Sequence, residues 1–377
     1  MEYAMSAPEP LMLLPSAFER QDYRFASAFS VLEEAIRERA FPAASVAATF
    51  EGRLIALKAF GHFTYQYDSP AVTSDTLFDL ASLTKVVATT SLAMRLYERG
   101  LLDLDATVAA IVPEFVSHPE KDSRRRDVTL GMLLSHSSGL PAYEKLFLKA
   151  RTREELLHAV FTMPLASDPR SRANYSDIGF ILLGVALGRL ADEPLDSSCQ
   201  AEIFAPIGMT NTAFNPPANL RWQVPPTTDD RTFRHRIIQG EVQDENASIL
   251  GGVAGHAGVF STAADLAHFA HAMLSPGALV RRETLALFTR RETSPAGTSQ
   301  ALGWDTPSAP SQSGRYFGPG SFGHLGYTGT SLWIDPGRQL SIVLLTNRTW
   351  PDCSNQAIQQ VRPRFHDAVI EALDKSG

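Results

Sequence analysis

The sequence predicts an α/β protein in which helices flank an antiparallel sheet and a mainly helical domain is inserted into the chain. Two observations support this: a β-rich hairpin near each end of the chain, and a long stretch of helical patterns between them. A lone hairpin is only marginally stable in water, so the two hairpins are expected to share one sheet. The predicted division is a loose leader over residues 1–17, a discontinuous α/β domain over 18–114 and 236–377, and an inserted helical domain over 115–235.

The first hairpin is preceded by an amphipathic helix. Its apolar residues recur at spacings of three and four, which places them on one helical face: Phe25, Phe29, Leu32 and Ile36. The helix is expected to end at Pro42. Residues 45–50 and 53–60 then form two β-rich runs joined by Glu51-Gly52, a pair suited to a tight turn.

Residues 82–99 are expected to form a helix that stops at Gly100. The strand signal fades from about 105 to 240, where short helical patterns and many prolines occur. The second hairpin consists of residues 327–334 and 340–346, separated by the turn residues Asp335-Pro336-Gly337. A last amphipathic helix presents five apolar residues on one face: Ile358, Val361, Phe365, Val369 and Leu373.

The composition excludes several classes of protein. With 377 residues, 44% hydrophobic and 20% charged, the chain is neither disordered nor fibrous. A net charge of −7 without a basic block argues against nucleic acid or an anionic membrane as partner. No run approaches the roughly 20 apolar residues of a membrane span, and no signal peptide is visible. We therefore expect a cytoplasmic protein, or a periplasmic one if a leader has been removed.

One short motif offers a nucleophile. Only six of the 34 basic residues are lysines, and one of them follows a serine by three positions, in Ser82-Leu83-Thr84-Lys85. At the start of a helix these two side chains share a face, so the amine can assist deprotonation of the hydroxyl. The helix N-terminus would also favour a developing oxyanion. By itself, the pair could equally be an N-cap serine beside a solvated lysine.

Two further segments add to this motif. Tyr175-Ser176-Asp177 opens an apolar helix, although a tyrosine there could simply serve packing. The segment from Gly323 to Gly329 (GHLGYTG) enters a hydrophobic strand, and its glycines would leave backbone N–H groups open to a ligand. A β-bulge or tight turn is the structural alternative for this segment.

In this order and at these spacings, the three segments resemble the serine β-lactamase and penicillin-binding-protein superfamily. The similarity is greatest to the branch of class C β-lactamases, D-Ala-D-Ala carboxypeptidases and related esterases. Supporting stretches lie at residues 129–141, 203–214 and 240–265 (TLGMLLSHSSGLP, IFAPIGMTNTAF and GEVQDENASILGGVAGHAGVFSTAAD). The resemblance covers roughly residues 25–370 and implies a β-lactamase/transpeptidase-like fold that needs neither a cofactor nor a metal.

The resemblance implies catalytic roles for three side chains. Ser82 matches the nucleophile that forms an acyl-enzyme, Lys85 the lysine that assists its deprotonation, and Tyr175 the tyrosine that shuttles the proton. The backbone N–H groups of Ser82 and Tyr327 match the oxyanion hole. A tyrosine has an ordinary pKa near 10, so we expect Lys85 and a charged His324 to lower the pKa of Tyr175.

Four further residues are candidates for substrate binding: Asp177, His324, Gly326 and His256. The family usually has Asn where this chain has Asp177, and Thr or Ser where it has Leu325. An ionised Asp can only accept hydrogen bonds, whereas Asn can also donate to a substrate amide carbonyl. We therefore expect esters to be preferred over amides, and Asp177 to pair with Lys85.

These observations predict a serine hydrolase that acts on a small carboxylic ester, amide or β-lactam. The alternative is a catalytically silent binding or scaffold protein that keeps the fold, supported only by the two departures at Asp177 and Leu325. No Gly-x-Ser-x-Gly motif is present, which removes the main support for an α/β-hydrolase. The sequence does not indicate the oligomeric state.

Overall fold

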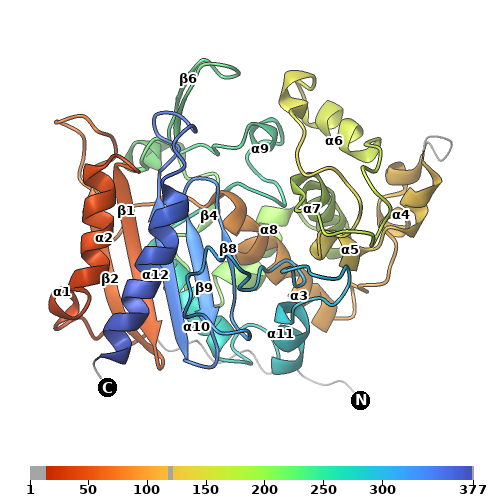
Figure 1. The fold of residues 1–377 in the computed structure, drawn as a ribbon. Helices are drawn as coiled ribbons and strands as arrows, with labels where there is room; N and C mark the ends of the chain where they lie inside the picture. Colours follow the sequence, from red (N-terminus) through yellow and green to blue (C-terminus); the bar gives the residue numbers. More distant parts are fainter. Residues whose placement is uncertain (1–13, 118–121, 376–377) are drawn as a thin grey trace.

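The computed structural model describes residues 14–117 and 122–375, and its centre is a five-stranded antiparallel sheet (Figure 1). The strand order is β2-β1-β10-β9-β8. The strands are β1 (Ala43–Phe50), β2 (Arg53–Gly61), β8 (Phe322–Leu325), β9 (Ser331–Asp335) and β10 (Leu340–Thr346). The predicted fold class, an antiparallel sheet flanked by helices, is therefore confirmed.

The two terminal hairpins share this sheet, as their sequence patterns predicted. Residues Glu51 and Gly52 join β1 to β2 with φ angles of 48° and 72°, which is the left-handed geometry of a tight hairpin turn. On its other side β1 pairs with β10, with Ala44 opposite Thr346. Strands from opposite ends of the chain thus lie side by side.

Helices cover both faces of the sheet. On one face α2 (Ala26–Arg37) packs with α12 (Ile358–Asp374), and on the other lies α10 (Ala263–Leu274) (Figure 1). Every residue of β1 except Phe50 is buried, and so is every residue of β10. Strands buried on both faces are read as continuous apolar runs, which is why these segments lack a polar alternation.

The second hairpin is shorter than predicted. A strand was expected over residues 327–334, but β9 begins only at Ser331, and residues 326–330 form a turn between β8 and β9. Gly326 N–H donates to Thr330 O at 2.8 Å, and Gly329 has a φ of 101°. A Cβ at Gly326 would collide with Thr330 and with the Leu80 carbonyl, so the turn lies directly against the segment before Ser82.

The predicted helix over 82–99 consists of three pieces. A 3₁₀ turn (Ala81–Leu83) leads into a π-helical stretch (Lys85–Thr90), and α3 (Ser91–Glu98) follows, with Gly100 at a φ of 69° after it. All residues of the π-helical stretch are buried. Such π-helical turns are rare and frequently occur at functional sites.

The middle of the chain is mainly helical. Its helices are α4 (Val108–Ile111), α5 (Leu130–Leu134), α6 (Arg153–Phe161), α7 (Asp177–Ala191) and α8 (Leu195–Cys199). The other α-helices and strands are α1 (Gln21–Arg24), α9 (Glu245–Ile249), α11 (Arg282–Thr289), β3 (Phe78–Asp79), β4 (Ala213–Phe214), β5 (Thr228–Asp230), β6 (Arg236–Ile238) and β7 (Val259–Ser261). Among the described residues, no helix is both long enough and apolar enough to cross a bilayer.

The predicted division into domains stays a prediction. Its boundary at 235 and 236 falls between β5 and β6, which pair with each other. Of the predicted leader, residues 1–13 lie outside the described part of the chain. Its last residues are not loose: Leu14 is buried, and Ala17 N–H donates to Leu54 O at 2.9 Å.

Candidate active site

The segment that carries Ser82 is held in an unusual backbone conformation. Ala81, directly before it, has a φ of 47°, in the left-handed region that residues with a Cβ rarely adopt. The buried carboxylate of Asp79 accepts a hydrogen bond from Ala81 N–H at 2.8 Å. From the β8–β9 turn, Thr328 Oγ1 donates to Asp79 O at 2.8 Å and Thr330 Oγ1 to Leu80 O at 2.9 Å. These contacts fix the direction in which Ser82 is presented.

Lys85 lies one helical turn beyond Ser82 and is fully buried. Its Nζ donates to Ser82 Oγ at 2.8 Å and to the carbonyl of His256 at 3.2 Å, and it lies 2.7 Å from Asp177 Oδ1. Burial, the largest single effect, would lower the pKa of Lys85, but its interactions with Asp177 and Tyr175 together raise that pKa. The predicted Lys85–Asp177 pair is therefore present, and it keeps Lys85 protonated.

Tyr175 comes from the loop before α7 and lies over Lys85. Lys85 Nζ is 4.8 Å from the centre of its ring, and its side chain interacts with both Lys85 and Ser82. Burial raises the pKa of Tyr175, and the positive charge of Lys85 only partly offsets this effect. The expectation of a lowered pKa is wrong for this structure: although the residue as a whole is 38% exposed, desolvation disfavours the phenolate more than Lys85 favours it.

The start of α7 fixes Tyr175 and Asp177. Ser176 is the N-cap of the helix: its Oγ accepts a hydrogen bond from Gly179 N–H at 2.9 Å and donates to Pro141 O at 2.6 Å. Ser176 N–H donates to Nδ1 of the buried His136 at 3.0 Å, and the His136 ring lies 4.7 Å from that of Tyr175. His136 therefore anchors this turn rather than lining the cavity.

The segment from His324 to Tyr327 borders the same cavity as Ser82. His324 Nδ1 donates to Leu325 O at 2.7 Å, because a carbonyl can only accept. Burial, aided by the charge of Lys85, lowers the pKa of His324 to about 3. The expected charged His324 is therefore wrong: the ring is neutral near pH 7 and leaves Nε2 as an acceptor.

Two backbone N–H groups are free to bind a ligand. Within residues 14–117 and 122–375, neither Ser82 N–H nor Tyr327 N–H donates to a protein acceptor. Ser82, Gly326 and Tyr327 all line the same cavity. These are the two groups predicted as an oxyanion hole.

His256 contacts both Lys85 and Asp244. Its carbonyl accepts from Lys85, and its Nε2 lies 2.9 Å from Asp244 Oδ1. Burial, the largest single effect, would raise the pKa of the Asp244 carboxyl, but His256, the N–H of Ala247 and the charge of Lys85 together lower it. His256 lines the cavity, as predicted, although its side chain is 1% exposed.

One cavity of about 770 Å³ is bordered by Ser82, Tyr175, Asp177, His256, His324, Gly326 and Tyr327, whereas the fully buried Lys85 is not among its lining residues. Part of its wall consists of Tyr143, Phe147 and Thr232. In this wall the helical middle of the chain meets the β5–β6 hairpin, since the ring of Phe147 lies 5.0 Å from that of Phe233. The volume is that of a site for a small molecule.

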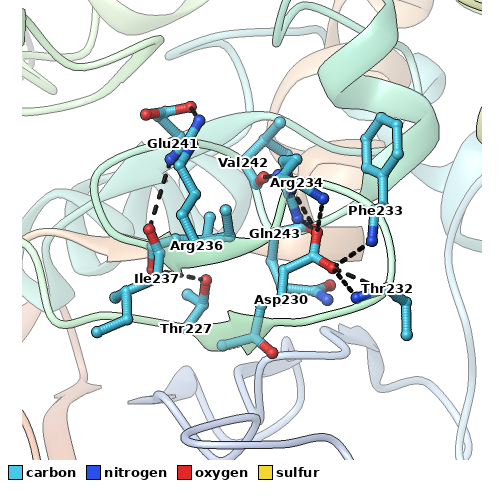
Figure 2. Close-up of polar contacts among 12 residues, drawn as sticks. Thr227, Asp230, Thr232, Phe233, Arg234, Arg236, Ile237, Glu241, Val242 and Gln243 are labelled. Carbon is cyan, nitrogen blue, oxygen red and sulfur yellow. Dashed lines mark hydrogen bonds and ion pairs between the residues drawn. The ribbon is translucent and has the colours of Figure 1, made fainter.

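A buried ion pair stiffens the hairpin part of this wall (Figure 2). Asp230 accepts hydrogen bonds from the N–H groups of Thr232, Phe233 and Arg234, and from Arg234 Nε at 2.8 Å. Arg234 also donates to the carbonyls of Val242 and Gln243, at 2.7 Å each. The pair therefore ties the hairpin to the irregular segment that leads to Asp244.

Sequence reasoning missed several residues of the site. Asp79 could have been suspected from its position two residues before Ala81, where Asp often accepts from a turn N–H. Arg348 and Arg362 line the cavity and contact the turn around Tyr327, but nothing in the sequence separated them from the other arginines. Among the described residues, no group of His, Cys, Asp and Glu side chains could hold a metal ion.

Comparisons with known proteins agree with this fold. The family model Beta-lactamase matches residues 29–361. A putative D-alanyl-D-alanine carboxypeptidase from Salmonella gallinarum is 30% identical, covering 84% of this chain and 81% of its own. An N-acetylmuramyl-L-alanine amidase from Bacillus subtilis is 33% identical, covering 82% of this chain and 77% of its own.

Solved structures share the whole architecture at lower identity. EstCE1, a hydrolase with promiscuous acyltransferase activity, superimposes with a TM-score of 0.74 at 23% identity, covering 93% of this chain and 99% of its own. A penicillin-binding-protein homologue from Caulobacter crescentus gives 0.74 at 20% identity, covering 97% and 100%. The chain therefore belongs to the beta-lactamase family, within the superfamily of serine β-lactamases and penicillin-binding proteins.

Proposed function

We propose that this protein is a serine hydrolase that forms an acyl-enzyme on Ser82. The observation that carries the proposal is the 2.8 Å hydrogen bond from Lys85 Nζ to Ser82 Oγ, inside a cavity that two free N–H groups also border. A cation in contact with the hydroxyl stabilises the alkoxide that develops during attack. The hydrolases named among its relatives and structural neighbours are consistent with this chemistry.

In acylation, Ser82 Oγ attacks the substrate carbonyl carbon while Tyr175 moves the proton. Since burial raises the pKa of Tyr175 and Asp177 keeps Lys85 charged, neither side chain is a free base at rest. Tyr175 therefore accepts the proton of Ser82 as it gives its own proton to the leaving group. The Oγ–C bond forms, the bond from carbon to the leaving group breaks, and the alcohol or amine departs neutral.

Deacylation repeats these steps with water in place of the leaving group. Water attacks the acyl carbon, and its proton passes to Tyr175, which returns its own proton to Ser82 Oγ. The carboxylic acid product leaves and loses its proton to solvent. Lys85 remains protonated throughout and acts only through its charge and its hydrogen bond.

The negative charge on the carbonyl oxygen is the main charge that the site must stabilise. The N–H groups of Ser82 and Tyr327 are the proposed donors to this oxygen. Fixed donors of this kind stabilise a transition state without reorganising, and removing one typically costs roughly 10²–10³-fold in kcat.

The proposed substrates are small carboxylic esters, with amides and β-lactams as poorer ones. Asp177 borders the cavity and pairs with Lys85, and as a carboxylate it cannot donate to a substrate amide carbonyl. An ester also has the better leaving group, so it depends less on such a donor. His324 Nε2, Gly326 and His256 are the further groups proposed to contact the substrate.

The test is covalent labelling followed by intact mass spectrometry. A fluorophosphonate or a fluorescent penicillin should add one equivalent to the wild-type protein, with the adduct on Ser82, and none to Ser82→Ala. A panel of p-nitrophenyl esters then ranks the acyl groups. A wild-type protein that remains unlabelled and hydrolyses none of the panel would support the silent scaffold instead.

A further inference from the structure

The peptide bond between Gly326 and Tyr327 has an unusual partner. Its N–H is the proposed oxyanion donor, and its carbonyl, on Gly326, accepts a hydrogen bond from Arg362 Nη2 at 2.7 Å. The two groups belong to one conjugated amide unit, so what binds the oxygen affects the N–H. A cation at the oxygen draws electron density from the nitrogen and makes the N–H a stronger donor.

Arg362 is a buried cation with few groups around it that stabilise its charge. It projects from α12, is 5% exposed, and has no ion pair with a carboxylate in the described part of the chain. Its Nη2 also donates to Thr330 O at 3.0 Å, but its buried Nε has no partner there. Burial and the nearby Arg348 lower its pKa. Holding two carbonyls in place does not need a charge, because a neutral amide donor could do so.

Arg348 offers an internal comparison. Its Nε donates to Tyr327 O at 2.6 Å, and its guanidinium lies 4.3 Å from the centre of the Tyr327 ring. It therefore holds the same turn, but through the carbonyl of the next peptide, which does not include Tyr327 N–H. Both arginines anchor the turn, but only Arg362 binds the peptide that contains Tyr327 N–H. Comparing variants of the two therefore distinguishes anchoring of the turn from polarisation of this N–H.

We propose that Arg362 is a positioning residue that acts through the Gly326–Tyr327 peptide, orienting and polarising Tyr327 N–H as an oxyanion donor. Arg362 also borders the cavity, but the role proposed here acts through this peptide and not through a contact with the substrate. The proposal rests on the proposed function, because it assigns Tyr327 N–H to the developing oxyanion. Its effect is expected in the transition state and not in ground-state binding, since charge on the carbonyl oxygen develops only during attack.

The experiment compares Arg362→Gln, Arg362→Lys and Arg348→Gln with the wild-type chain. Gln keeps a donor without charge, and Lys keeps the charge. The control is Arg364→Gln, an exposed arginine of the same helix that pairs with Glu34. The measurements are kcat and KM for a p-nitrophenyl ester, the rate of Ser82 labelling by a fluorophosphonate, and the thermal midpoint.

Arg362→Gln should lower kcat and the labelling rate by roughly 10–100-fold, with KM within about threefold of wild type. Arg362→Lys should remain within about threefold in kcat, and Arg348→Gln should lose less than Arg362→Gln.

Equal losses in Arg362→Gln and Arg348→Gln, or an Arg362→Gln protein within twofold of wild type, would overturn the proposal. If Arg362→Gln does not fold, a loss of tenfold or more in a folded Arg362→Lys overturns it. A wild-type protein without any Ser82 adduct contradicts the proposed function itself, whereas normal labelling of Arg362→Gln contradicts this inference alone.

Discussion

The ammonium of Lys85 and the carboxylate of Asp177 lie 2.7 Å apart; Asp177 borders the cavity, and the lysine side chain is fully buried. The pair joins the π-helical stretch after Ser82 to the first residue of α7. It raises the pKa of Lys85, so the lysine next to the proposed nucleophile is a cation and not a free base. Proton transfer must then depend on Tyr175.

The first prediction concerns Ser82, Lys85 and Tyr175. Ser82→Ala should lower kcat/KM by at least ~10³-fold, because only binding and oxyanion stabilisation remain. Lys85→Ala and Tyr175→Phe should be comparably severe, and combining either with Ser82→Ala should add little, since the three act as a unit. Steady-state ester hydrolysis measures this, and near-wild-type turnover by Ser82→Ala would rule out the mechanism.

Asp177 should control the preference between esters and amides. Asp177→Asn supplies a donor for an amide carbonyl and removes the charge that raises the pKa of Lys85. We expect amide or β-lactam turnover to rise relative to ester turnover. The measurement is the ratio of kcat/KM for a matched ester and amide in both proteins. An unchanged ratio, or one that moves toward the ester in the variant, contradicts this account.

Asp79 should make stability depend on pH. Burial raises its pKa from 3.8 to about 6 in the folded protein. The folded state therefore favours protonated Asp79, and this stabilisation, complete below pH 3.8, is lost as the pH rises through about 6. Against Asp79→Asn, which does not titrate, the wild-type free energy of unfolding should fall by about 2 kcal/mol between pH 4 and 7. Urea unfolding of both proteins measures the difference, and a flat or rising difference would show the pKa to be ordinary.

The Asp230–Arg234 pair should control which substrates fit. Arg234→Leu leaves Asp230 buried without its cation and frees the segment at Val242 and Gln243, so the hairpin wall should loosen. We expect kcat/KM to fall about 5–20-fold for p-nitrophenyl octanoate and less than about twofold for the acetate. Arg231→Leu is the matched control, because Arg231 is 84% exposed and pairs only with Asp229 in the described structure. Equal losses for both esters would exclude a role of the wall in selectivity.

Local sequence patterns predicted the parts of the protein that depend on local chemistry. Glu51-Gly52 forms the expected turn, because left-handed φ angles suit a two-residue hairpin. The spacing of Ser82 and Lys85 predicted their contact, since residues three apart share a helical face. The ordered combination of these short segments, more than any one of them, indicated the family.

Properties set by tertiary packing were not predictable in this way. The pKa of Tyr175 and that of His324 depend on desolvation and on charges that tertiary packing brings near them, and no sequence spacing reveals either effect. The strand expected at Tyr327 gave way to a turn, because Gly326 packs against Leu80 from a distant part of the chain. Arg362 donates to backbone carbonyls. Because every residue has a carbonyl, the sequence does not show which of them an arginine binds.

The pairing of β1 with β10 also determines when the molecule can become complete during synthesis. The hydrogen bond from Ala43 N–H to Asn347 Oδ1 joins residues 304 positions apart. At the usual speed of translation, β10 is synthesised roughly 15–60 s after β1. During this time one edge of β1 is unpaired, and its apolar residues are exposed to neighbouring chains. When Ser82 has emerged from the ribosome, Tyr327 has not yet been synthesised. At that stage the nascent chain has the nucleophile but not the complete cavity. Protection of that edge by a chaperone should therefore improve the yield of folded protein more than changes near the site.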